Sequence, residues 1–109
     1  MSSYNRVTLV GKLKDDPVIN DANKRCKASF ELAVERFYGK DKNPIVDYFN
    51  IVCDGKLAEV CVSYLSKGKK VLVDGHIQVR TLNKDGERKW ITEIVAENLK
   101  FLATTEPSA

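Results

Sequence analysis

The stretch V-D-Y-F-N-I-V-C-D-G-K-L-A-E-V-C-V-S-Y-L, residues 46–65, decides the fold, because it begins as a strand and ends as a helix. From Val46 to Asp54 the residues alternate, with Phe49 on one face and Tyr48 on the other. A period of two is typical of a strand that is buried on one side only. We therefore predict a half-buried strand that carries Tyr48 on its outer face.

Beyond Gly55 the pattern changes to the spacing of a helix. From Leu57 to Leu65 apolar residues recur every three or four positions, which predicts a short amphipathic helix. Lys67 followed by Gly68 is a typical end of a helix, so we predict that Lys67 lies in its last turn.

Composition limits the class of protein. A chain of 109 residues with 43% hydrophobic residues is one small domain, and its net charge of +3 suits a polyanionic partner and an ordinary solvated surface equally well. It has no apolar run long enough to span a membrane, and its first residues lack the apolar core of a signal peptide. Three cysteines without C-x-x-C spacing and a single histidine predict no metal site, no cofactor and a reducing, intracellular setting.

The order of the predicted elements indicates a small barrel. The predicted strands are Arg6–Leu13, Ala28–Arg36, Val46–Asp54, Lys70–Arg80 and Trp90–Leu102. Gly11 and Gly75 are expected to bend their strands, and Asp85-Gly86 predicts a tight hairpin turn. Three strands, a helix and two strands are the order of an OB-fold, although this pattern alone leaves an unrelated small α+β domain open.

Four motifs resemble the bacterial single-stranded DNA-binding protein family. They are N-R-V-T-L-V-G-K-L-x-x-D-P (5–17), G-K-L-A-E-V (55–60), Y-L-x-K-G (64–68) and T-E-I-V-A-E-N (92–98). The resemblance covers Asn5 to Leu102 and implies an all-β OB-fold, a five-stranded Greek-key barrel with one helix between its third and fourth strands. It implies such a domain over residues 1–103, followed by a short polar tail at 104–109.

The resemblance also implies a function. Such proteins coat single-stranded DNA without sequence preference during replication, recombination and repair, and they assemble as homo-oligomers, usually tetramers. We therefore expect single-stranded DNA as the partner, a homotetramer or a dimer, and a cytoplasmic location at the nucleoid. No Ser/His/Asp set, phosphate-binding glycine loop or paired carboxylates with a metal ligand is visible, so we expect no catalytic residues and no enzyme.

Three aromatic residues are candidates for stacking on bases. Tyr48 faces outward by its alternation, and the family resemblance implies that an aromatic stacks on DNA at this position. Tyr38 matches a second stacking position of the family, although a loop aromatic that closes the end of the barrel is an alternative. Trp90 lies beside the predicted hairpin turn and either contacts nucleic acid or packs under the hairpin.

Basic residues would contact phosphates. The candidates, each of which could equally be a solvated charge, are Arg6, Lys12, Lys56, Arg80, Lys84, Arg88 and Lys89.

The chain departs from the family pattern at four outward positions, where relatives carry aromatic or basic residues: Asp54, Asn50, Gln78 and Leu82. An anion at Asp54 repels phosphate, but Asp is also a favoured helix N-cap. These departures predict weaker binding, or a different path for the DNA.

Two rival functions remain open from the sequence. One is a primosomal accessory protein, an OB-fold dimer that acts mainly through protein partners, and the other is an OB module that binds RNA or only protein. The family usually ends in an acidic tip that recruits other proteins, whereas residues 103–109 contain one acidic residue. We therefore expect this chain not to capture partners that depend on such a tip.

Overall fold

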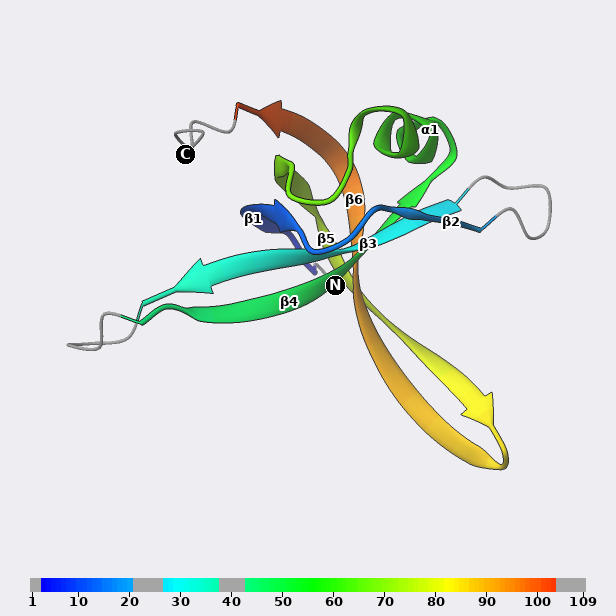
Figure 1. The fold of residues 1–109 in the computed structure, drawn as a ribbon. Helices are drawn as coiled ribbons and strands as arrows, with labels where there is room; N and C mark the ends of the chain where they lie inside the picture. The colour runs from blue at the N-terminus through cyan, green and yellow to red at the C-terminus, as the bar shows by residue number, and fades with distance from the viewer. Residues whose placement is uncertain (1–2, 21–26, 38–42, 104–109) are drawn as a thin grey trace.

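The computed structural model describes residues 3–20, 27–37 and 43–103 and shows a closed barrel. Along the chain the elements are β1 (Val7–Leu13), β2 (Val18–Asn20), β3 (Lys27–Arg36), β4 (Ile45–Asp54), α1 (Gly55–Tyr64), β5 (Lys70–Lys84) and β6 (Glu87–Leu102) (Figure 1). The sheet order is β1-β5-β6-β4-β3-β2, and an additional pairing of β1 with β3 closes it. Five strands form the barrel and β2 only extends the edge of β3, so the predicted five-stranded OB barrel is confirmed.

Most neighbours in the barrel are antiparallel, and one pair is parallel. β5 and β6 pair along their whole lengths, and β3 pairs with β4 from Lys27–Asp54 to Arg36–Ile45. β4 and β6 run parallel and meet only at Ile51–Ile94 and Val52–Val95. The β4–β6 pairing is therefore a short seam that joins the two halves of the barrel.

The alternation predicted for β4 is confirmed. Ile51 and Cys53 are fully buried in the barrel, while Tyr48 and Asp54 are exposed on the outer face. Cys53 and Cys61 are both fully buried core residues. A hydrogen bond with Cys61, together with burial, raises the pKa of the Cys53 thiol, so this thiol stays protonated and unreactive.

The helix closes one end of the barrel and is shorter at its end than the sequence predicted. It buries Ala58 and Cys61 but ends at Tyr64, so the prediction that Lys67 lies in its last turn is wrong. Leu65 takes an extended backbone, which carries its side chain into the core. The next residues turn back onto β1, where the Gly68 N–H donates to the carbonyl oxygen of Leu13 at 2.9 Å.

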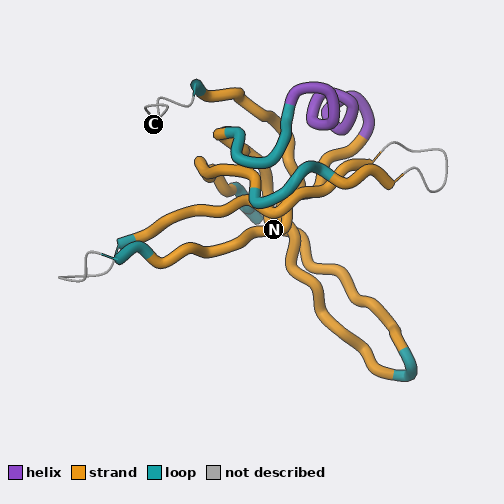
Figure 2. The backbone as a smooth tube through the Cα atoms, viewed as in Figure 1, coloured by secondary structure: helices purple, strands orange, loops and turns teal. Residues whose placement is uncertain are grey.

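Two hairpins project from the barrel as arms (Figure 2). In the β3–β4 arm, β3 ends at Arg36 and β4 begins at Ile45, and the β5–β6 arm ends in a two-residue turn, Asp85-Gly86, in which both residues have positive φ. The turn was predicted, but the strands continue to Lys84 and from Glu87, beyond the predicted limits at Arg80 and Trp90. Ile77 and Val79 share the face of the buried Val73 but are exposed, because the arm has left the barrel.

Gly75 lies where β5 bends from the barrel into the arm. The pairing of β5 with β6 shifts by one residue between Asp74 and Gly75, which is a β-bulge. A methyl group on Gly75 would overlap the carbonyl oxygen of Val95. The close approach of these two backbones therefore requires glycine, as the sequence suggested.

Within the described residues no helix is long and apolar enough to cross a membrane.

Candidate nucleic-acid interface

Tyr48 lies on the outer face of β4 with 54% of its surface exposed. The Lys14 ammonium lies 4.9 Å from the centroid of its ring, within the range of a cation–π interaction. The same ammonium lies 3.6 Å from a carboxylate oxygen of Glu31 on β3. The predicted stacking residue is thus an exposed ring with a cation beside it.

An open hollow of about 580 Å³ adjoins this ring, and we call it the Tyr48 hollow. Phe37, Lys12 and Lys70 are among the residues that line it. Phe37 is an exposed aromatic at the end of β3, next to Tyr38. Tyr38 itself lies outside the described residues. The Tyr48 hollow therefore combines two aromatic side chains with two lysines.

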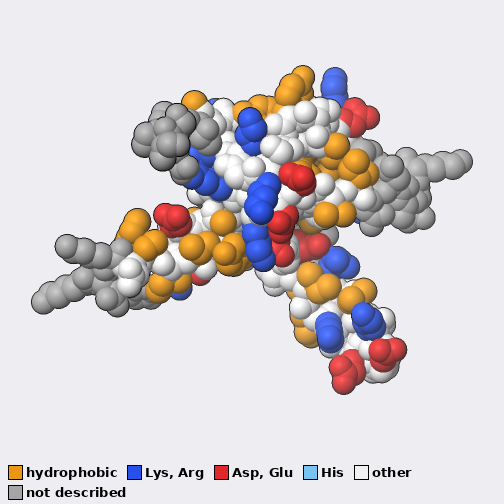
Figure 3. All heavy atoms as spheres, viewed as in Figure 1, with side chains coloured by type: hydrophobic (Ala, Val, Ile, Leu, Met, Phe, Trp, Pro, Cys, Tyr) orange, Lys and Arg blue, Asp and Glu red, His pale blue; other side chains and the backbone are white. Residues whose placement is uncertain are grey.

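Trp90 lies on the β5–β6 arm and is 69% exposed. It pairs across the arm with Thr81, on the same face as the exposed Val79. The alternative that Trp90 packs beneath the hairpin is therefore wrong. Figure 3 shows apolar side chains along both arms, and basic side chains among them on the β5–β6 arm. Each arm thus presents an aromatic surface to solvent.

The predicted basic residues divide into two groups. Lys56 and the arm residues Lys84, Arg88 and Lys89 form no ion pair with the part of the chain that the structure describes. Arg80 instead holds Glu93, with 2.8 Å between Nε and Oε1. Of the predicted residues, those at the arm tip and the start of α1 are the most available to a phosphate.

Arg6 is engaged with the barrel. Its guanidinium donates to both carboxylate oxygens of Asp74, with 3.0 Å from Nε to Oδ1, and the Thr8 hydroxyl donates to the same carboxylate. The hydrogen bond from Arg6 lowers the pKa of Asp74, and the same bond raises the pKa of Arg6. A contact of Arg6 with phosphate stays a prediction.

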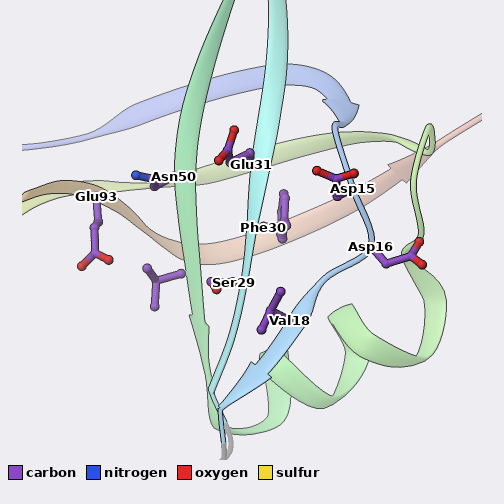
Figure 4. A pocket seen from close by; sticks show the side chains of 9 residues that line it. Asp15, Asp16, Val18, Ser29, Phe30, Glu31, Asn50 and Glu93 are labelled. Atoms are coloured by element: carbon purple, nitrogen blue, oxygen red, sulfur yellow. The ribbon is translucent and has the colours of Figure 1, made fainter.

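A second hollow, on the outer face of β3 and β4, is acidic. Carboxylates of Asp15, Asp16, Glu31 and Glu93 line it together with Asn50 of β4 (Figure 4). One Asp16 oxygen accepts the backbone N–H of Lys67 at 2.8 Å. Glu31 pairs with Lys14 and Glu93 with Arg80, so two of the four carboxylates already hold a cation.

Asp54 occupies the N-cap position of α1 but does not form the usual hydrogen bond from its side chain to the helix. Its backbone is extended, as in an N-cap, yet its side chain makes no capping hydrogen bond. One carboxylate oxygen lies 4.0 Å from the Lys27 ammonium instead. The N-cap position of Asp54 is therefore confirmed, but its carboxylate does not cap the helix by a hydrogen bond, and its charge lies on the outer face.

Sequence reasoning missed Lys14 and Phe37. Lys14 lies just beyond β1, and only the pairing of β1 with β3 brings it to Tyr48. Phe37 lies just beyond β3, where the alternation no longer shows which residues face outward. Among the described residues no group of three or more His, Cys, Asp or Glu could hold a metal ion.

The closed barrel, with one helix among the described residues, defines an OB-fold, a class of fold that binds oligonucleotides and oligosaccharides. The fold matches the solved structure of Plasmodium falciparum SSB in complex with ssDNA with a TM-score of 0.84 and 29% identity, over 94% of this chain and 98% of that one.

Sequence comparison narrows this class to a family. Residues 4–102 match the single-strand binding protein family, and the chain belongs to that family. Single-stranded DNA-binding protein 3 of Clostridium acetobutylicum is 44% identical, over 90% of this chain and 70% of the relative. Single-stranded DNA-binding protein 1 of Staphylococcus aureus strain MSSA476 is 42% identical, over 90% of this chain and 65% of the relative.

Proposed function

We propose that this protein binds single-stranded DNA without sequence preference and protects it during replication, recombination and repair. The observation that carries the proposal is the exposed Tyr48 ring on the outer face of the barrel, with Lys14 beside it and Lys12 and Lys70 in the adjoining hollow. Bases stack on such rings with little sequence preference, at about 1–3 kcal/mol per base, while cations hold the backbone. The proposed setting is the cytoplasm, at the nucleoid.

We further propose that the chain acts as a homo-oligomer. Residues Val7–Gly11 of β1 pair with β5 alone among the described residues, so the opposite edge is open to a second copy. The exposed Val10 adds apolar surface to the same strand. Both features support an interface built on β1.

Titrating oligo-dT, oligo-U and duplex DNA at several salt concentrations tests the proposed function. We expect tight binding of oligo-dT, with an affinity that falls by about 0.7 log units per contacted phosphate for each log unit of salt. Equal affinity for duplex, or no dependence on salt, would contradict single-strand binding. Preference for oligo-U would favour an RNA-binding module instead.

A primosomal accessory role is a second candidate, because acidic residues occupy part of the outer face. Under that role, binding of oligo-dT would be weak, while the barrel itself would capture replication proteins.

A further inference from the structure

A pair of exposed aromatic side chains lies far from both arms. Tyr64 ends α1 and Phe101 lies near the end of β6, and their ring centroids are 5.7 Å apart. The rings are 67% and 48% exposed, and neither belongs to the core. In Figure 1 α1 and the end of β6 lie together at the upper end of the barrel, whereas the arm tips point to the left and to the lower right. The pair is therefore separate from Tyr48 and Trp90.

Basic residues predominate in the segments that carry this pair. Residues 60–73 and 99–103 contain Lys67, Lys69, Lys70 and Lys100 and neither Asp nor Glu, and Glu59 and Asp74 lie immediately outside these ranges. The two segments lie side by side, because Lys70 pairs with Leu102 and Leu72 with Lys100.

Most of these charges are not neutralised nearby. Lys67, Lys69 and Lys70 form no ion pair with described residues, whereas Lys100 lies close enough to Asp74 to lower the pKa of that carboxyl. The Asp16 carboxylate also lies nearby, bound to the backbone of Lys67. On the outer face, by contrast, acidic residues pair with Lys14, Lys27 and Arg80. Lys67, Lys69 and Lys70 therefore remain available to a phosphate, and the exposed Glu59 of α1 is the acidic residue nearest to them along the helix.

Lys70 is the first residue of β5 and lines the Tyr48 hollow. It pairs with Leu102, whereas Val71 pairs with Phe101, so the Lys70 side chain and the Phe101 ring project from opposite faces of β5 and β6. We propose that Tyr64 and Phe101, with Lys67 and Lys69, form a second contact for the same DNA strand, which passes from the Tyr48 hollow around the start of β5. This inference rests on the proposed function and extends its site to the helical end of the barrel.

Two lengths of oligo-dT test the second contact. One probe has about 5 nucleotides and the other about 16, near the two limits of site size for a single OB-fold. We expect the double variant Tyr64→Ala/Phe101→Ala to bind the long probe about tenfold more weakly and the short probe unchanged. The double variant Val18→Ala/Ile19→Ala, which removes exposed apolar side chains from β2, is the control and should bind both probes as the unaltered protein does.

A charge variant provides an independent readout. Lys67→Gln/Lys69→Gln should lower the salt slope for the long probe by about 1.4, since each lost phosphate contact removes about 0.7. An unchanged affinity of the aromatic variant for the long probe would overturn the inference alone. If that variant also lost mass in light scattering, the pair would be a contact between copies of this chain. Failure of the unaltered protein to bind either probe would overturn the proposed function, and the inference with it.

Discussion

At the scale of single residues, the outer face is governed by which charges are already paired. Arg6 holds Asp74, Arg80 holds Glu93 and Lys14 lies between Glu31 and the Tyr48 ring. An ion pair with a partly exposed partner is weak, at about 0–1 kcal/mol, so a phosphate competes readily for these cations. Lys56, Lys84 and Lys89 form no ion pair with described residues, so a phosphate would not have to displace a carboxylate from them.

Asp54 offers the sharpest test at this scale. We expect Asp54→Phe to bind oligo-dT about tenfold more tightly, because the change removes an anion from the outer face and adds a ring for stacking. Since the side chain makes no capping hydrogen bond, the expected cost in folding free energy is only the lost attraction to the helix N-terminus, about 0.3–1 kcal/mol. Fluorescence titration and urea unfolding measure the two effects.

The matched control is Asp54→Asn, which removes the charge without adding a ring. Its affinity should lie between those of the unaltered protein and Asp54→Phe. If neither variant binds more tightly, Asp54 does not face the DNA.

At the scale of elements, the β-bulge in β6 opposite Gly75, where Glu97 has no partner in the pairing of β5 with β6, sets the direction of the Trp90 arm. We expect Gly75→Ala to destabilise the protein by about 1–3 kcal/mol or more, because the new methyl group overlaps the Val95 carbonyl oxygen and forces β5 away from β6. Urea unfolding measures this loss. Ser29→Ala on the exposed side of β3 is the control and should change stability by less than about 0.5 kcal/mol. An unfolding midpoint equal to that of the control would contradict the role of Gly75.

The elements also show how far the sequence predicts this fold. β4 was predicted well because one of its faces is buried, so the burial of Ile51 and Cys53 appears as alternation. The ends of β5 and β6 were not predicted well, because the arm is exposed on both faces. Residues such as Val79 and Trp90 therefore do not alternate between buried and exposed positions. The end of α1 was misplaced because Leu65 fits a helical spacing but fills the core from an extended backbone.

Some features of the candidate site could be predicted from the sequence and others could not. Tyr48 was predicted as an outward residue from the pattern of its own strand. Lys14 lies near the Tyr48 ring because β1 pairs with β3. Arg80 lies near Glu93 because of the register in which β5 pairs with β6. The alternation of apolar and polar residues within one strand does not predict which strands pair or in which register.

At the scale of the whole molecule, the open edge of β1 leads to a test of assembly. We expect light scattering at micromolar concentration to give a mass of two or four chains. Val10→Lys should reduce it, because a charge on an exposed face beside the open edge opposes pairing. Val18→Lys on the exposed surface of β2 is the control and should keep the mass of the unaltered protein. A single-chain mass for the unaltered protein would contradict the proposed assembly.

The seam between β4 and β6 has a consequence for how the chain folds. Ile51 and Ile94 are separated along the chain by α1 and the whole of β5, yet only two residue pairs join the strands. Bringing together the ends of a loop of about 40 residues costs roughly 3 kcal/mol of chain entropy. The β3–β4 and β5–β6 hairpins close far shorter loops, so each can form before the seam does. We therefore expect the seam to close late in folding, at an entropic cost, and this step joins the strand that carries Tyr48 to the arm that carries Trp90.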